Sequence, residues 1–181
     1  VDFFQPKAFL MENVPNIISM AGGTIKDHIL KTFTDLGYHV QYKILTASDY
    51  GVPQKRKRAF FIGFKHPSKF TFPTPFTPDK LVSSAQAISD LPVESLPNNS
   101  PYPIAAQSDY QHLMRLKSSG VCSHEVSKHT EQTVRLIGMI PDGGNYKSLP
   151  LDLQDTRRVN IAWTRLNSQK PSFTIDTGHR H

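Results

Sequence analysis

The sequence predicts an α/β fold, in which the closing part of an α/β sheet is followed by a smaller, loop-rich lobe. A short apolar run at residues 8–11 ends at a turn signal, which predicts a buried β-strand. A helical pattern and two more strand-like segments follow up to residue 64, which gives the order strand–helix–strand–loop–strand. From Pro67 to Pro103 the density of proline excludes regular sheet and long helices. The 181 residues suffice for one domain, or for one and a half small ones.

The helix predicted between the first two strands has one apolar side. Thr24 followed by Asp27 resembles a capping box at its start, and Gly37 is a typical residue after a last helical turn. Its apolar residues share one face: Ile25, Ile29, Leu30, Phe33 and Leu36. We therefore expect this helix to pack on the core.

Two further strands complete the predicted sheet. Residues 39–45 alternate polar and apolar side chains, which predicts a strand with one covered face. Residues 47–53 are predicted to form a loop, and the apolar run at 59–64 is predicted to pair near residues 39–45.

The remainder of the chain is predicted to be rich in loops. We interpret residues 67–103 as a linker and the entrance to a second lobe, with one short helix around Val82 to Leu91. A second helix is predicted to open within residues 127–137 and to stop near Ile140-Pro141. Residues 142–145, Asp-Gly-Gly-Asn, have the composition of a turn.

The net charge and the cysteine content of the chain indicate which kind of partner it binds and in which kind of cellular compartment it lies. The net charge of +6 favours a polyanionic partner, although basic charge alone is a moderate signal for nucleic acid. The single cysteine, Cys122, argues against a disulfide framework and is typical of a reducing compartment. No apolar run reaches the ~18 residues of a membrane helix, and the first residues do not resemble a signal peptide. Because the sequence opens without Met, we expect it to begin inside a longer protein.

Glu12 is the first candidate site residue. It directly follows an apolar strand, and open α/β sheets bind their ligands at the carboxyl ends of strands. Burial at that point would favour the protonated carboxyl, which would then donate or share a proton near neutral pH. The alternative is a strand-end carboxylate that faces water, and this stretch alone favours neither interpretation.

The basic segment Gln54-Lys55-Arg56-Lys57-Arg58 is the second candidate. In an extended segment the side chains of Gln54, Arg56 and Arg58 share one face. A solvated edge strand would have the same composition. Because the segment leads directly into the apolar strand, at least one arginine is expected to be drawn toward the core. There it needs a carboxylate, a phosphate or a carbonyl as acceptor.

Together, the two stretches resemble a known family. Glu12-Asn13-Val14 resembles the Glu-Asn-Val motif of the cytosine-5 DNA methyltransferases, and residues 54–58 resemble that family's Gln-x-Arg-x-Arg motif, preceded by Tyr-Gly-Val-Pro. The order of the motifs and the helix and strand between them also match. Residues 72–75 and 87–92 resemble the family's Phe-Pro-x-Pro exit and its Ala-Ile-x-Asp-Leu-Pro segment. Residues 140–150 resemble a segment of the target-recognition lobe, and residues 163–166 and 170–175 resemble the stretch that leads back to the catalytic domain.

The resemblance implies a division of the chain into parts. Residues 1–78 correspond to the C-terminal part of the catalytic domain, the closing part of a Rossmann-like methyltransferase sheet. Residues 79–172 correspond to the smaller target-recognition lobe, and residues 173–181 to the start of the return to the catalytic domain.

The resemblance also implies an activity: transfer of a methyl group from S-adenosylmethionine to carbon 5 of a cytosine that is flipped out of double-stranded DNA. The implied enzyme is of the restriction-modification or phage type. Glu12 matches the family's carboxylate at ring nitrogen 3, and Arg58 matches the arginine at ring oxygen 2. Arg56 matches its neighbour near the active-site loop and phosphate, while Asn13 and Gln54 match residues that orient these groups.

Two family motifs have no counterpart in the sequence. The Pro-Cys nucleophile motif is absent, and Cys122 lies far downstream in the expected recognition lobe. The glycine-rich cofactor motif is absent as well, since Gly22-Gly23 follows the wrong element. We therefore expect a missing upstream part or a partner chain to bind most of the S-adenosylmethionine, and we expect this chain to be inactive alone.

Two alternative functions stay open at this point. One is a non-catalytic DNA-binding module, or one half of a split methyltransferase. The other is a tRNA cytosine-5 methyltransferase, although the long second lobe favours DNA. For each of them the expected location is the bacterial cytoplasm, in association with the nucleoid and without a membrane.

Other residue groups give weaker signals, and no metal site is assigned. Cys122, His124 and His129 lack a second cysteine and the spacing of a common zinc site. Lys147, Arg157 and Arg158 are candidates for phosphate contacts, with a solvated loop as the default interpretation.

Overall fold

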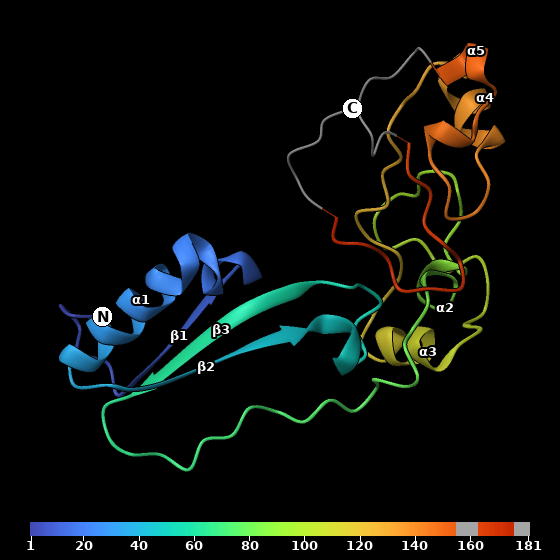
Figure 1. Ribbon diagram of the computed structural model, residues 1–181. Coiled ribbons are helices and arrows are strands. Elements are labelled where there is room, and N and C mark those ends of the chain that lie inside the picture. The colour runs from blue at the N-terminus through green and yellow to red at the C-terminus, as the bar shows by residue number, and fades with distance from the viewer. Residues whose placement is uncertain (155–162, 176–181) are drawn as a thin grey trace. The chain divides into compact units, whose positions relative to one another are not determined.

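A computed structural model of the chain describes residues 1–154 and 163–175 (Figure 1). The chain divides into two compact units. The first comprises residues 1–50 and 55–78, and the second comprises residues 51–54 and the described residues from 79 onward. The two candidate motifs therefore do not lie wholly in one unit, because Gln54 belongs to the second unit and residues 55–58 belong to the first.

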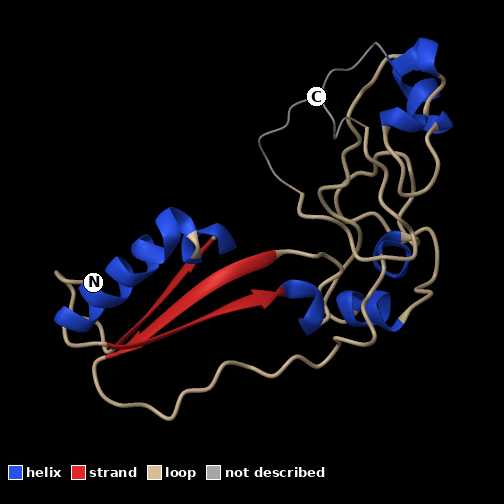
Figure 2. Cartoon of the chain, viewed as in Figure 1, coloured by secondary structure: helices blue, strands red, loops and turns tan. Residues whose placement is uncertain are grey.

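The first unit is built on a three-stranded sheet, shown in red in Figure 2. Its strands are β1 (Ala8–Asn13), β2 (His39–Thr46) and β3 (Lys57–Phe64), in the spatial order β1-β3-β2. Both pairs are antiparallel. The predicted order of elements and the predicted pairing of the last two strands are confirmed.

The prediction that the first strand is buried is wrong. β1 pairs on one side only, with β3, in the described part of the chain. Its residues alternate between two faces, so Phe9 and Met11 pack against the core while Leu10 points to the other face and stays 64% exposed. The apolar run 8–11 was therefore a correct signal for a strand but not for its burial.

Helix α1 (Thr24–Asp35) packs on one face of this sheet, as predicted (Figure 1). The core beneath it joins residues from the strands, the preceding turn and the helix: Met11, Ile17, Ile18, Ile29, Leu30, Ala59 and Phe61. The rings of Phe9 and Phe33 lie 4.2 Å apart, centre to centre, which extends this contact along the helix.

The start of α1 differs from the predicted capping box. Two short 3₁₀ turns, η1 (Pro15–Ile18) and η2 (Met20–Gly23), lead directly into the helix. The residue before the helix is Gly23, whose φ of 95° favours glycine, and Thr24 lies inside the first turn with its hydroxyl bonded to the carbonyl of Ala21. At the other end Gly37 has a φ of 83°, as expected of a residue that terminates a helix.

The predicted loop after β2 contains a 3₁₀ turn, η3 (Ala47–Tyr50). This turn connects β2 with the basic segment that enters β3. The amide of Ala47 donates to the carbonyl of Arg56 at 2.8 Å, so the two ends of the connection are bonded to each other.

The second unit consists of short helices and loops. The predicted helix near residue 85 is confirmed as α2 (Ser84–Ile88), with a capping box between Ser83 and Gln86. The predicted helix before Pro141 is confirmed as α4 (Glu131–Met139), which begins after its cap Thr130. Elements that the sequence did not predict are α3 (Asp109–Arg115), η4 (Tyr146–Ser148) and α5 (Leu151–Gln154).

Two small cores stabilise this unit. One is the apolar cluster of Leu136, Ile140, Tyr146 and Leu149, under α4 and η4. The other is polar and joins α2 to α3: Arg115 donates to the buried carboxylate of Asp90, and Gln111 donates to the hydroxyl of Ser89 at 3.0 Å. A buried carboxylate needs such a partner, because an unpaired charge in the interior is costly. Within residues 1–154 and 163–175, no helix has the length and apolarity needed to cross a membrane.

The contact between Phe9 and Gly63 gives a test of the first unit. The two residues are opposite each other in the β1–β3 register, and a Cβ on Gly63 would overlap the Phe9 ring. Because Phe33 and Tyr38 also contact that ring, we expect Gly63→Ala to lower the free energy of unfolding by about 1–3 kcal/mol. Urea denaturation followed by circular dichroism measures this.

The matched control is Gly138→Ala in α4, where a Cβ meets no atom within 4 Å. That variant should keep or gain stability, by up to about 1 kcal/mol, because alanine favours a helix over glycine. Equal stabilities of Gly63→Ala and the parent protein would contradict the close packing of Phe9 on β3.

Candidate functional site

Glu12 and Arg58 meet on one face of the sheet. In the β1–β3 register Glu12 is opposite Phe60, and Arg58 lies two residues before Phe60 on the same face. The Nε of Arg58 is 2.6 Å from Oε1 of Glu12, and Nη1 of Arg58 donates to the carbonyl of Lys57 at 2.8 Å. The expectation that an arginine of the basic segment turns inward to a carboxylate or a carbonyl is confirmed for Arg58, whose side chain is only 20% exposed.

Of the two interpretations left open for Glu12, the structure agrees with neither in full, because the carboxylate is partly exposed and also ion-paired. Its side chain is 45% exposed, because β1 is an edge strand of the described sheet. The carboxylate is held by an ion pair instead of by an apolar environment. One of its faces therefore stays accessible to a ligand while Arg58 fixes its orientation.

Arg56 lies at the edge of this pair. Its Nη2 is 3.9 Å from Oε1 of Glu12, and its side chain is about as exposed as that of Glu12. Arg56 precedes β3, and its carbonyl accepts the amide of Ala47 from η3. The position of Arg56 therefore depends on the connection between β2 and β3 rather than on the sheet alone.

A pocket of about 430 Å³ opens beside these charges. Its lining combines the three charged residues with apolar and aromatic side chains: Glu12, Leu45, Ala47, Tyr50, Arg56, Arg58 and Phe60. The β2–β3 register explains part of this lining, because Leu45 is opposite Arg58. A fixed carboxylate and guanidinium at one side of an apolar pocket are suited to bind the polar edge of a small planar group.

The other two predicted site residues lie outside this pocket. The side-chain oxygen of Asn13 accepts the amide of Val14 at 2.8 Å, so Asn13 stabilises the end of β1. Gln54 belongs to the second unit, where it forms an isolated parallel bridge with Ser172. The amide of Ser172 donates to the carbonyl of Pro53 at 2.9 Å.

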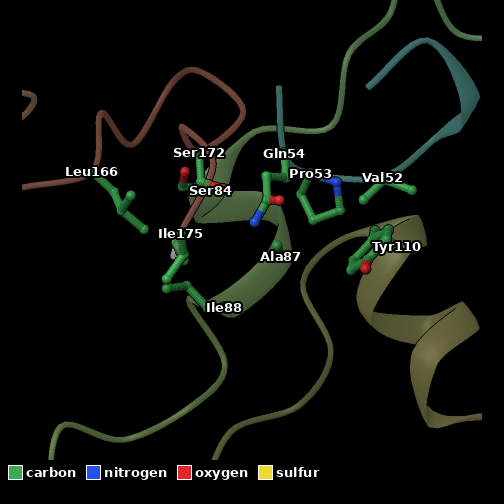
Figure 3. A pocket seen from close by; sticks show the side chains of 10 residues that line it. All are labelled: Val52, Pro53, Gln54, Ser84, Ala87, Ile88, Tyr110, Leu166, Ser172 and Ile175. Atoms are coloured by element: carbon green, nitrogen blue, oxygen red, sulfur yellow. The ribbon is translucent and has the colours of Figure 1, made fainter. Parts of the chain in front are cut away.

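Gln54 lines a different pocket, of about 340 Å³, shown in Figure 3. Its side chain extends toward α2, and Tyr110 of α3 forms part of the same lining. The complete lining is Val52, Pro53, Gln54, Ser84, Ala87, Ile88, Tyr110, Leu166, Ser172 and Ile175. Most of these side chains are apolar, so Gln54 contributes to the packing of the second unit.

Sequence reasoning missed the uncharged part of the Glu12 pocket. Phe60 could have been predicted as a lining residue, because strand alternation places residue 60 on the same face as Arg58. Tyr50 could not have been predicted, because its position depends on the 3₁₀ turn η3 within the predicted loop.

The weaker candidates do not form a site in the described residues. Cys122 is a free, exposed thiol whose sulfur lies 3.3 Å from the side-chain oxygen of Asn99. In residues 1–154 and 163–175, Cys122, His124 and His129 are not part of any group that could hold a metal ion. Lys147 is exposed in η4, whereas Arg157 and Arg158 lie outside the described residues.

The family of the chain follows from its similarity to known protein families. The model of the C-5 cytosine-specific DNA methylase family matches residues 1–172. The chain belongs to this family. The matched range includes both candidate motifs and most of the second unit.

Curated relatives of this chain are Type II methyltransferases. The chain is 37% identical over 169 residues to Type II methyltransferase M.DdeI of Desulfomicrobium norvegicum, an alignment that covers 87% of the chain and 41% of the relative. It is 30% identical over 175 residues to Type II methyltransferase M1.HphI of Haemophilus parahaemolyticus, which covers 97% of the chain and 42% of the relative. The chain thus spans about two fifths of the length of these relatives.

The fold of the chain also has a solved counterpart. A DNA modification methyltransferase encoded within an Escherichia coli prophage is similar over 96% of the chain and 54% of its own length, with a TM-score of 0.69 and 21% sequence identity. This similarity supports the mixed α/β architecture with its small antiparallel sheet.

The exposure of the Glu12–Arg58 pair predicts that it contributes little to stability. Half-exposed ion pairs stabilise proteins by roughly 0–1 kcal/mol, because solvent screens the charges. A double-mutant cycle with Glu12→Gln and Arg58→Gln, measured by urea denaturation, should give a coupling energy of about 1 kcal/mol or less.

The reference cycle uses Lys31 and Asp35, an exposed pair on α1 with an N–O distance of 2.7 Å. A coupling of about 3 kcal/mol or more between Glu12 and Arg58 would indicate a structural pair of the buried type. That result would remove the argument that these residues are held in place for a ligand.

Proposed function

We propose that this chain is part of a DNA (cytosine-5-)-methyltransferase of the Type II restriction-modification class, and that Glu12 and Arg58 bind the target cytosine. The observation that carries the proposal is the 2.6 Å contact between Glu12 and Arg58 in the lining of a pocket, in a chain that belongs to the C-5 cytosine-specific DNA methylase family. The partner is double-stranded DNA, and the proposed location is the bacterial cytoplasm, in association with the nucleoid.

The roles of the charged residues follow from the chemistry of cytosine. Attack of a thiolate on carbon 6 places negative charge on the ring, and this charge must be stabilised before carbon 5 can accept a methyl group. The Glu12 carboxyl would share a proton with ring nitrogen 3, and the Arg58 guanidinium would donate to ring oxygen 2. Arg56, at the rim of the pocket, would contact the active-site loop or a phosphate of the flipped nucleotide.

Asn13 and Gln54 have supporting roles in this proposal. Asn13 fixes the backbone directly after Glu12, through its bond to the amide of Val14. Gln54 anchors the start of the basic segment beside Ser172. Neither residue lines the pocket that contains Glu12, so we assign both to the orientation of the substrate site rather than to direct contact.

The cofactor is not assigned to residues of this chain. S-adenosylmethionine supplies the methyl group when it is bound. The glycine pair Gly22-Gly23 does not fit a cofactor cradle, since a Cβ on Gly22 would meet no atom within 4 Å and both glycines form the turn before α1. We propose that polypeptide outside this sequence binds S-adenosylmethionine.

The nucleophile is assigned to the same outside polypeptide. Cys122 is the single cysteine of the sequence, follows Val121 rather than a proline, and lies in the second unit beside Asn99. A nucleophilic cysteine needs neighbours that stabilise its thiolate, and a side-chain amide oxygen does not. The chain alone is therefore proposed to be inactive.

We further propose a role for each part of the chain. Residues 1–78 would be the C-terminal part of the catalytic domain and would close a Rossmann-like sheet. Residues 79–172 would form the target-recognition lobe, and residues 173–181 would begin the return to the catalytic domain. Flipping brings the cytosine to the pocket, because carbon 5 is unreachable for this chemistry inside the duplex.

The roles of Glu12 and Arg58 predict a large loss of activity on substitution. Removing a donor that stabilises the transition state costs roughly 10²–10³ in rate. In the native protein, Glu12→Gln or Arg58→Ala should therefore lower kcat for DNA methylation at least a hundredfold, measured by transfer of a tritiated methyl group.

The control is Asp35→Asn, which also removes an ion-paired carboxylate but lies on the outer side of α1. It should leave kcat unchanged. Near-normal turnover of Glu12→Gln at equal folded fraction would overturn the assignment of the site.

The rival function is a non-catalytic DNA-binding module, and the basic segment 55–58 is the observation that favours it. Titration of the native protein with duplex DNA at 50 and 200 mM salt, and with S-adenosylmethionine, separates the two. We expect salt-dependent DNA binding together with cofactor binding. DNA binding without any cofactor binding would favour the rival, and preferential binding of tRNA over duplex DNA would favour a tRNA methyltransferase.

A further inference from the structure

A short proline-rich segment is fastened to the turn that forms one wall of the Glu12 pocket. The segment is Pro73-Thr74-Pro75-Phe76-Thr77, and the turn is η3. Both belong to the first unit. The segment lies within the predicted linker and overlaps the stretch that resembles the family's Phe-Pro-x-Pro exit, and the proposed function gives it no role.

Four hydrogen bonds hold the segment on η3. The hydroxyl of Tyr50 donates to the carbonyl of Pro73 at 2.9 Å. The amides of Phe76 and Thr77 both donate to the carbonyl of Asp49, at 3.1 and 3.0 Å, and the hydroxyl of Thr77 donates to the carbonyl of Ser48 at 2.9 Å. Prolines at positions 73 and 75 restrict the unfolded segment, which lowers the entropy lost when it is fixed in this way.

We call these four hydrogen bonds the clamp. The Tyr50 side chain connects the clamp to the pocket. Its hydroxyl is engaged by Pro73, and its ring meets the Phe76 ring edge-on, with 6.0 Å between the ring centres. The same side chain lines the pocket with Glu12, Arg56 and Arg58. The bond to Pro73 and the contact with Phe76 thus fix the orientation of a side chain that lines the pocket.

The clamp also acts on Arg56. Arg56 precedes β3, and its carbonyl is bonded to the amide of Ala47, the first residue of η3. When η3 is held in place, the backbone of Arg56 is held with it. Precise placement of such groups matters, because displacements on the order of 1 Å can cost on the order of a hundredfold in rate.

We propose that Tyr50 and Thr77 are positioning residues for the target-base pocket: they lock η3 so that the Tyr50 ring and Arg56 keep their places beside Glu12 and Arg58. This inference rests on the proposed function, since it assigns a role in the same pocket. It adds a part of the chain, residues 73–77, that acts through the turn and does not touch the reacting atoms.

The experiment compares kcat and KM of variants of the native protein, per folded molecule, with DNA and S-adenosylmethionine as substrates. Tyr50→Phe removes only the hydroxyl, and Thr77→Val replaces the threonine hydroxyl with a methyl group of similar size. We expect each variant to lower kcat on the order of tenfold with an unchanged KM for S-adenosylmethionine. Thr77→Ser, which keeps the hydroxyl, should have the same kcat as the native protein.

The matched control is Tyr38→Phe, which removes a tyrosine hydroxyl that also donates to a proline carbonyl, that of Pro6 at 2.8 Å, in the first unit but outside the pocket lining. It should leave kcat unchanged. A further readout is the double variant Tyr50→Phe/Glu12→Gln. It should be no slower than Glu12→Gln alone, because Tyr50 acts through the site that Glu12 completes.

The outcomes separate this inference from the function on which it rests. If Glu12→Gln lowers kcat a hundredfold but Tyr50→Phe behaves like Tyr38→Phe, the positioning role is overturned and the proposed function stands. If the losses in the double variant simply multiply, Tyr50 has a general structural role and the inference is also overturned. If Glu12→Gln itself is fully active, the proposed function fails first.

Discussion

The central position of β3 is the constraint on which the candidate site depends. β3 is the only described strand that pairs on both sides, with β1 and with β2. Its register with β1 sets Glu12 opposite Phe60, and its register with β2 sets Leu45 opposite Arg58. Because side chains alternate along a strand, these four residues share one face, and a slip by one residue would move Arg58 to the other face. The core on the opposite face, around Ala59 and Phe61, fixes that register.

The sequence was informative where a local pattern determines the structure. Apolar runs predicted the first and third strands, alternation predicted the second, and helical periodicity predicted α1. The direct entry of the basic segment into an apolar strand predicted an inward arginine with a carboxylate, phosphate or carbonyl partner. The burial of β1 was predicted wrongly, because burial depends on how many strands flank β1, and an apolar run does not encode that number. The capping box predicted at Thr24 is absent for a similar reason. The residue before the helix is Gly23, the last residue of η2, which has a left-handed conformation and no side chain to cap the helix.

The division of the chain could not be derived from motif spacing. Gln54 and Arg58 belong to one sequence motif, yet Gln54 is bonded into the second unit by Ser172, more than a hundred residues later, while Arg58 is bonded into the first. A motif that is continuous in sequence therefore serves two packing environments. Tyr50 illustrates the opposite case, in which residues distant in sequence, Pro73 and Thr77, determine how a pocket wall is held.

The most direct test of this account is the crystal structure of the native protein with DNA in which the target base is trapped outside the duplex. The account predicts the cytosine in the pocket next to Tyr50 and Phe60, with ring nitrogen 3 at hydrogen-bond distance from the Glu12 carboxyl and ring oxygen 2 at hydrogen-bond distance from the Arg58 guanidinium. A trapped base that lies elsewhere, with the Glu12–Arg58 pair directed to solvent, would contradict it.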